Sequence, residues 1–152
     1  LRRELRERVY GKLPEAIIHG DLHPGNVKFA GDRVAGFFDF DWANRWERVR
    51  DIGDGALFFT SRREEFNGED IWSLTADFTV DEKAAEAFLT AYDSVSRIEK
   101  EERKALGSVL AARWLQSRVR GMRKVGKERR MEFLDRGDLF RVLEAAEGFR
   151  GS

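Results

Sequence analysis

Polar and acidic residues interrupt two apolar stretches in the first third of the sequence. The first group runs from His19 to Asn26, and the second consists of Asp39 and Asp41, which follow Phe37 and Phe38. Such groups rarely end buried strands for packing reasons alone, because leaving water costs them free energy. Carboxylate and amide oxygens suit Mg²⁺, and a free carboxylate beside them can accept a proton. The pattern therefore predicts a catalytic loop next to a magnesium-binding segment.

A short β-hairpin is expected to join these two groups. The stretch Ala30-Gly31-Asp32-Arg33 supplies turn-forming residues, and counting outward from it places Asn26 opposite Phe37. Opposed residues share a sheet face, as do residues two apart along a strand. Asn26 and Asp39 are therefore predicted to point the same way, with their backbones roughly 7–8 Å apart. From that separation both side chains could reach one cation.

An acid, an Asn five residues later and a second acid after the next strand form the pattern that phosphoryl transfer requires. The stretches from His19 to Asn26 and from Phe38 to Asp41 resemble the catalytic loop and metal-binding segment of the aminoglycoside phosphotransferase and choline kinase-like superfamily, which includes homoserine and fructosamine kinases. Protein kinases carry Arg at the position of Gly20 and Lys at that of His23, so these two residues favour the small-molecule branch. The resemblance covers about residues 15–55.

The resemblance implies a role for each polar residue and implies Mg²⁺ and ATP as cofactors. Asp21 would orient and deprotonate an acceptor hydroxyl, while Asn26 and Asp39 would bind Mg²⁺ and, with it, the nucleotide. His23 would either donate to the transferring phosphoryl group, as part of the catalytic and cofactor-binding set, or only position the loop. Asp41 would add a second metal contact or remain a solvated acid. The implied substrate is a small molecule with a hydroxyl group.

His19 and Asp51 are expected to support the loop rather than to react. A neutral imidazole at His19 can bridge two backbone groups. Asp51 matches an acid that family members carry after the metal-binding segment, and is expected to cap the N-terminus of a helix or to accept a hydrogen bond that braces the loop. Residue type alone leaves plainer roles open, because Asp21 could be a turn residue and Asn26 a cap of the strand.

Two other classes of function compete with phosphoryl transfer. His19, Asp21 and His23 alternate along the chain and could be ligands of a transition-metal hydrolase site. That site would leave Asn26 and Asp39 without a function, and the chain contains only 2 histidines. The other alternative is a kinase remnant that is retained as a non-catalytic interaction module.

The composition limits the classes of partner. The 152 residues suffice for one domain, and Lys+Arg 28 balances Asp+Glu 28, so no overall field would attract nucleic acid or an anionic membrane. The absence of Cys fits a reducing cytoplasm. No apolar run is long enough to span a membrane, and the start does not resemble a signal peptide. The expectation is a soluble, cytoplasmic protein without nucleic-acid or membrane partners.

The expected fold class is α+β and mainly helical, a protein-kinase-like C-terminal lobe with a small hairpin that carries the catalytic loop. A single domain over 1–152 would comprise this hairpin at 17–41 and a helical subdomain at 49–150. Helices are predicted over 1–12, 50–60, 80–94, 99–125 and 138–147. Thr79 is the expected N-cap of the helix that ends near Ser94, with Glu82 completing a capping box.

Two further expectations concern the surroundings of the site. The Trp-rich stretch 42–48 is predicted to be a connecting loop, in which a Trp either packs on later helices or lines an acceptor pocket. The buried stripe of helix 99–125 is predicted to consist of Ala105, Val109, Ala112, Leu115, Val119 and Met122. The cations along and beyond this helix are interpreted as solvated or as a substrate-binding surface; they are Arg113, Arg118, Arg120, Arg123, Lys124, Lys127, Arg129 and Arg130.

Members of the resembled superfamily consist of two lobes, and the N-terminal lobe binds the nucleotide. Nothing before Ile17 has the strand pattern or the Gly-rich turn that such a lobe requires. The expectation is therefore that this lobe is missing from the 152 residues and is supplied by the same protein or by a partner chain. Because positioning the γ-phosphate is most of the catalysis, the isolated chain is expected to show little or no kinase activity.

Overall fold

The computed structural model describes residues 11–63, 67, 69–76 and 78–136. The helix predicted over 138–147 lies outside these residues. So does the helix predicted over 1–12, except that Gly11 and Lys12 form a turn. In the described part of the chain, no helix is both long and apolar enough to span a membrane.

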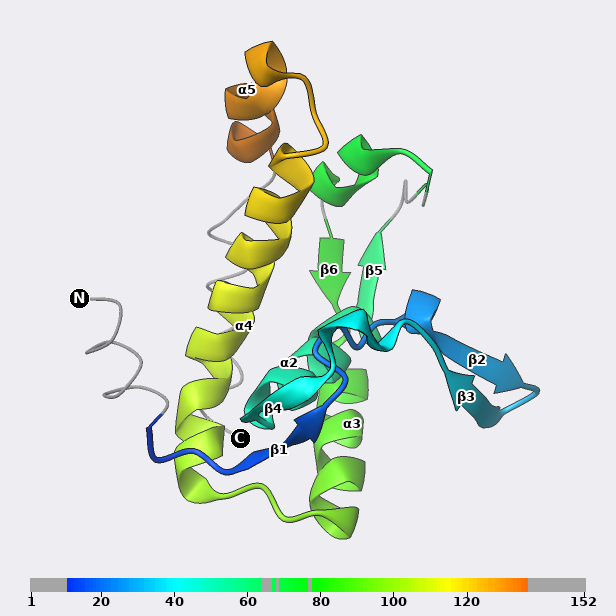
Figure 1. The fold of residues 1–152 in the computed structure, drawn as a ribbon. Helices are drawn as coiled ribbons and strands as arrows, with labels where there is room; N and C mark the ends of the chain where they lie inside the picture. The colour runs from blue at the N-terminus through cyan, green and yellow to red at the C-terminus, as the bar shows by residue number, and fades with distance from the viewer. Residues whose placement is uncertain (1–10, 64–66, 68, 77, 137–152) are drawn as a thin grey trace.

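The described strands form three separate antiparallel pairs (Figure 1). β1 (Glu15–Ile18) pairs with β4 (Asn44–Glu47), β2 (Val27–Ala30) with β3 (Arg33–Phe37), and β5 (Ser61–Arg63) with β6 (Phe78–Val80). The hairpin β2–β3 projects from the body of the molecule on the side away from α4 (Figure 1). Charged and polar residues such as Asn44 and Arg45 give β4 little strand pattern of its own. The prediction of a connecting loop over 42–48 was therefore wrong, because a partner strand far away in the chain creates β4, as in the pairing of Ile17 with Arg45 and of Glu15 with Glu47.

The longer helices are α2 (Val49–Phe58), α3 (Glu82–Val95) and α4 (Lys100–Met122), followed by the short α5 (Arg130–Asp135). Single 3₁₀ turns lie at η1 (Pro24–Asn26), η2 (Phe40–Trp42), η3 (Ile71–Thr75) and η4 (Lys127–Arg129). α2, α3 and α4 fall within a few residues of the predicted ranges. The mixed helix-and-strand class predicted from the sequence is confirmed at this coarse level.

The N-cap of α3 differs from the prediction. Asp81 occupies this position, and its Oδ1 accepts a hydrogen bond from the backbone N–H of Ala84 at 3.1 Å. Thr79 lies two residues earlier, inside β6. A capping box does occur at the start of α4, where Glu99 and Glu102 exchange side-chain and backbone hydrogen bonds. Asp caps a helix as well as Thr does, so the sequence pattern could not choose between them.

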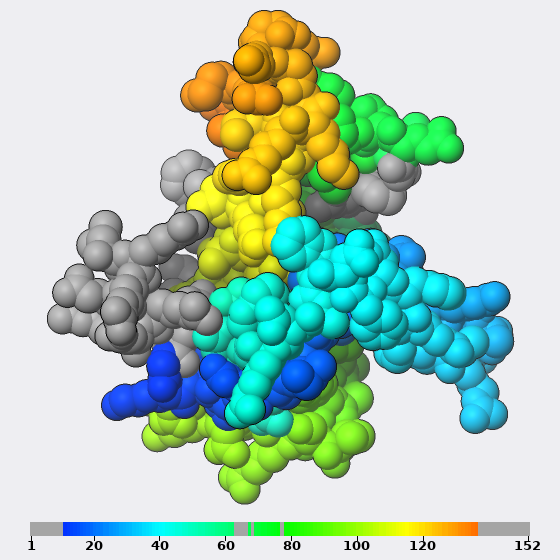
Figure 2. Space-filling view, viewed as in Figure 1, coloured from blue at the N-terminus to red at the C-terminus, as the bar shows by residue number. Residues whose placement is uncertain are grey.

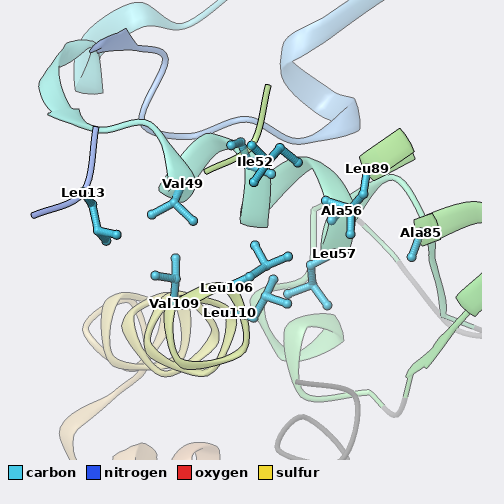
Figure 3. Close-up of a cluster of buried hydrophobic side chains, with 11 residues drawn as sticks. Leu13, Val49, Ile52, Ala56, Leu57, Ala85, Leu89, Leu106, Val109 and Leu110 are labelled. Carbon is cyan, nitrogen blue, oxygen red and sulfur yellow. The ribbon is translucent and has the colours of Figure 1, made fainter. Parts of the chain in front are cut away.

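The core lies where α2 packs against α4 on one side and α3 on the other (Figure 3). α2 supplies Val49, Ile52, Ala56 and Leu57, and α4 supplies Leu106, Val109 and Leu110. α2 and α3 approach closely at Gly55, where a Cβ atom would lie 2.3 Å from a ring carbon of Phe88. This packing fixes α2 and α4 against each other, and both helices reach the candidate site.

The predicted buried stripe of α4 was wrong in part. Val109 is buried and Ala105, Val119 and Met122 are half-buried, but Ala112 and Leu115 are exposed. The buried face is instead shared by apolar residues such as Leu110 and by three charged residues, Glu102, Arg113 and Arg118. A prediction from hydrophobic periodicity assumes that charged residues face solvent. For a helix that buries charged residues in ion pairs, it therefore places the buried face at the wrong angle around the helix axis.

Glu102 holds together the start of α4 and the start of α2. Its side chain is 0% exposed, and its carboxylate accepts hydrogen bonds from Arg48 Nε at 2.9 Å and Nη2 at 2.7 Å. The same carboxylate accepts the backbone N–H of Glu99 at 2.9 Å. These bonds raise the pKa of Arg48, against the opposing effect of burial.

Glu102→Ala should lower the free energy of unfolding by about 3 kcal/mol, because it removes the carboxylate that pairs with the largely buried guanidinium of Arg48. Chemical denaturation measures the change. Glu15→Ala is the matched control, since it breaks the exposed ion pair between Glu15 and Arg45 and should cost less than about 1 kcal/mol. Equal losses in the two variants would contradict the role given to Glu102.

Candidate active site

The loop that carries the polar residues begins where β1 ends, and Asp51 of α2 holds its first two residues. The backbone N–H of His19 donates to Asp51 Oδ2 at 2.7 Å, and that of Gly20 donates to Oδ1 at 2.9 Å. A carboxylate that accepts two N–H groups forms charge-assisted bonds on both oxygens. The structure therefore assigns Asp51 the bracing role that was one of the two roles predicted from the sequence.

Gly20 is required by the backbone at this point. Its φ is +79°, and an added Cβ would lie 2.4 Å from the carbonyl oxygen of Trp42. A side chain here would be strained by the left-handed backbone and would also collide with backbone atoms. The loop can thus pass directly beneath the segment that contains Trp42.

His19 ties the loop to the second polar segment. Its side chain is buried, and Nε2 lies 2.6 Å from the carbonyl oxygen of Phe38, so this nitrogen carries the proton and donates. The ring also contacts Phe40, with centroids 4.8 Å apart. Nδ1 is buried and has no hydrogen-bond partner among the described residues. The geometry matches a supporting role and holds the residue immediately before Asp39 against the loop.

Asn26 closes the loop onto itself. Its side chain is buried, and Nδ2 donates to the backbone carbonyl of Asp21 at 2.9 Å. Its backbone carbonyl accepts the N–H of Phe38 at 2.9 Å. Because the amide nitrogen is used for Asp21, the amide oxygen is directed elsewhere, and within the described part of the chain nothing donates to it. An amide oxygen in this state fits a hard cation such as Mg²⁺.

The register of the hairpin differs from the prediction. Val27, not Asn26, pairs with Phe37, because the register shifts by one residue between Lys28 and Phe29. Asn26 lies in η1, before the strand begins. The shared face that was predicted for Asn26, Phe37 and Asp39 is therefore wrong as a strand argument, since a bulge changes which residues face each other.

Asp39 lies outside the strand and has a left-handed backbone, with φ of 58°. It is the single non-glycine residue with positive φ among those described. Asp adopts this conformation more readily than most residues, at some cost in free energy. The side chains of Asp39 and Asp41 are both exposed, and no contact in the described residues joins either of them to Asn26. Their carboxylates are free to bind a cation from solvent.

His23 and Asp21 lie side by side at the turn of the loop. Nδ1 of His23 accepts the backbone N–H of Gly25 at 3.1 Å, which leaves Nε2 as the protonated nitrogen of the neutral ring. Nε2 lies 3.9 Å from Asp21 Oδ2, and both side chains are partly exposed. The loop therefore presents a carboxylate and an N–H donor together to solvent.

Two buried charged residues that the sequence did not point to complete the support. Arg113 of α4 donates through Nη2 to the carbonyl of Gly20 at 3.0 Å, and through Nε to Asp54 Oδ1 at 2.8 Å. Asp54 of α2 is 0% exposed. Arg113 had been interpreted as a solvated or substrate-binding cation, which was wrong for this residue. Nothing in the local pattern marks it, because its partner lies 59 positions away.

The arrangement does not favour a transition-metal hydrolase. Among the described residues there is no group of three or more His, Cys, Asp or Glu side chains placed to hold a metal ion. His19 turns Nε2 to a backbone carbonyl, and His23 uses Nδ1 for Gly25. The oxygen donors Asn26 and Asp39 are a better fit to Mg²⁺ than to zinc.

Comparison with known proteins gives the family. A family model described as the phosphotransferase enzyme family matches residues 1–106, which is more than half of the chain. The chain belongs to this phosphotransferase family. The membership predicted from the catalytic loop and the metal-binding segment is thereby confirmed.

Curated relatives of this chain include several bacterial homoserine kinases. That of Neisseria meningitidis is 31% identical over 99 residues, which cover 65% of this chain and 28% of the relative. Those of Rhizobium meliloti and Sinorhizobium fredii are 35% and 36% identical over 94 residues, which cover 62% of this chain and 25% of each relative. The chain thus aligns with about a quarter of the length of these relatives.

Asp51→Asn should loosen the loop from His19 to Asn26 while preserving the shape of the side chain at position 51. The amide offers one acceptor oxygen where the carboxylate offers two, so one of the two N–H groups loses its partner. Hydrogen exchange at the amides of His19 and Gly20 should accelerate roughly 10- to 100-fold. Amides in the middle of α4 serve as the internal control and should exchange as in the unchanged protein. Unchanged exchange at both loop amides would refute the bracing role.

Asp54 should make stability depend on pH. Burial raises the pKa of its carboxyl to about 6, although the hydrogen bonds from Arg113 oppose this rise. Since the folded state then binds the proton more tightly than the unfolded state, the stability from this group falls as pH rises from about 4 to about 7 and is nearly constant above about 7. Comparison with Asp54→Asn isolates the effect. The stability of the unchanged protein relative to this variant should fall by about 1 kcal/mol between about pH 5 and about pH 7. A carboxyl that titrates below about 4 by NMR would contradict this.

Proposed function

We propose that this chain is the catalytic and metal-binding lobe of an ATP- and Mg²⁺-dependent kinase that phosphorylates a hydroxyl group of a small molecule. The observation that carries the proposal is the hydrogen bonding of the Asn26 side-chain amide. Its buried amide is fixed to the backbone of Asp21 through nitrogen, which leaves its oxygen free beside the segment that carries Asp39. Family membership supports a phosphotransferase of small molecules.

In the proposed reaction Asp21 accepts the proton of the acceptor hydroxyl as its oxygen attacks the γ-phosphorus of ATP. The bond from that phosphorus to the bridging oxygen of ADP breaks, and ADP leaves. Asp21 is partly exposed at the turn of a loop whose backbone is held at His19 and Gly20. Such a fixed and accessible carboxylate can orient a hydroxyl before reaction, which supplies much of the catalysis in this chemistry.

The remaining roles follow from the donor set. Asn26 and Asp39 would hold Mg²⁺, and the exposed Asp41 is placed to add a further contact. Mg²⁺, when bound, would neutralise charge on the phosphate oxygens. The protonated Nε2 of His23, beside Asp21, would donate to the phosphoryl group in transfer. A non-catalytic module is the weaker proposal, because Asp21, Asn26 and Asp39 are all present.

The acceptor that we propose to test first is homoserine, because the relatives with matching sequence are homoserine kinases. We further propose that sequence outside the 152 residues, or a partner chain, supplies the nucleotide-binding lobe. Large apolar side chains gather on the hairpin and on the segment after it, and they are half exposed: Phe29, Val34, Phe37, Phe38 and Phe40. Contact with a second lobe would bury them.

Asp21→Asn in the intact protein should lower turnover by roughly 10²- to 10⁴-fold with little change in the KM for ATP, because only proton acceptance is lost. Asp39→Asn is the matched comparison, since it removes the same charge from the metal-binding segment and keeps a residue that tolerates the left-handed backbone. It should instead raise the Mg²⁺ concentration needed for half-maximal rate. Steady-state assays of ADP release measure both. Turnover of Asp21→Asn within tenfold of the unchanged protein would remove Asp21 from its role.

A further inference from the structure

Arg120 of α4 lies at the edge of the loop that carries Asp21. Its guanidinium carbon is 4.1 Å from the centroid of the Trp42 ring. Trp42 ends η2, and its carbonyl is the group that approaches Gly20 so closely that no Cβ fits between them. Figure 2 shows the segment around η2 and β4 in cyan against α4 in yellow, on one continuous surface. Arg120 is therefore a neighbour of the catalytic loop, although it is about a hundred positions later in the chain.

Arg113 and Arg120, both on α4, differ in their partners. Arg113, two turns earlier on α4, is taken up by Asp54 and by the carbonyl of Gly20. The side chain of Arg120 forms no ion pair and no hydrogen bond with any of the described residues; its contact is the face of the Trp42 ring. Asp21 and Asp54 are close enough to favour its charge, but burial and the charge of Arg113 outweigh them and lower its pKa. An arginine still carries its charge under these conditions, so an anion beside it would be bound favourably.

Gln116 adds a second donor on the same face of α4, four positions before Arg120. Its Oε1 accepts from Arg113 Nη1 at 2.9 Å, which turns its amide nitrogen away from that guanidinium. Residues four apart on a helix are neighbours, so the amide of Gln116 and the guanidinium of Arg120 border the same space. A guanidinium fork with an amide N–H beside it is a donor set that suits a planar carboxylate.

We infer that Arg120 binds a carboxylate of the acceptor and so restricts this phosphotransferase to acceptors that carry one. The inference rests on the proposed function, and it adds the residue that selects the substrate. Trp42 lies under the guanidinium and holds its plane, and the acceptor hydroxyl extends from there toward Asp21. The γ-phosphate is a poorer match for Arg120, because its proposed Mg²⁺ ligands, Asn26 and Asp39, make no contact with Arg120 among the described residues, whereas Trp42 does.

The test uses the intact protein and compares two probes of nearly equal size. L-homoserine carries a carboxylate, and L-homoserine amide carries a neutral carboxamide in its place. Calorimetry should find that the unchanged protein binds the acid about 10- to 100-fold more tightly than the amide. Arg120→Gln should lose this preference by weakening the acid alone, and Arg120→Lys should retain part of it, since an ammonium keeps the charge but not the fork.

Arg123→Gln is the control, because Arg123 is exposed, follows Arg120 by one turn and carries the same charge. It should change the affinity for the acid by no more than about twofold, since charge at a distance is screened. The inference is overturned if the unchanged protein binds acid and amide equally, if it binds neither, or if Arg120→Gln keeps the preference. A preference that depends on Arg120, in a protein that transfers no phosphoryl group from ATP to homoserine, would uphold the carboxylate site and sink the kinase proposal.

Discussion

The backbone at His19 and Gly20 is held from two helices, and the geometry of the candidate site depends on this grip. Asp51 of α2 accepts both N–H groups, and Arg113 of α4 donates to the carbonyl of Gly20. A loop has no ladder of its own to fix it, so its conformation is set by what its backbone groups bind. Because the two anchoring side chains come from different helices, the loop is correctly shaped only while α2 and α4 are packed together.

That packing combines an apolar core with buried charge. Asp54 and Glu102 are both 0% exposed, and each is paired with an arginine from another element. A buried ion pair adds little net stability over an apolar pair of the same size, but an unpaired one is strongly unfavourable. Any packing of α2 on α4 that separated these pairs would leave charge without a partner. The pairs thus select one alignment of the helices, and the same alignment places Arg113 at Gly20.

The sequence predicted the parts of the site that are local. The loop from His19 to Asn26, the hairpin after it and the approximate ranges of three helices all depend on turn residues, caps and spacing within short stretches. The hydrogen bonds of Asp51, 31 and 32 positions from its partners, were expected only from the family resemblance. Prediction from the sequence failed where the structure of a segment depends on a partner far away in the chain. β4 exists because β1 pairs with it, and the buried face of α4 carries Arg113 because Asp54 is opposite. A one-residue bulge in the hairpin was also beyond prediction, and it invalidated the strand argument for Asn26 and Asp39.

The position of Asp39 depends on the hydrogen bonds that its neighbour Phe38 makes. β3 ends at Phe37, and Phe38 is then fixed by its N–H to Asn26 and by its carbonyl to His19. With both groups of Phe38 bound, the chain turns through the left-handed backbone of Asp39, a conformation that costs roughly 1 kcal/mol. The turn keeps Asp39 directly after Phe38, whose backbone is held by His19 and Asn26 at the two ends of the loop. Strained backbone at an exposed acid is found mainly at functional sites, and the proposed Mg²⁺ role of Asp39 would give this strain a function.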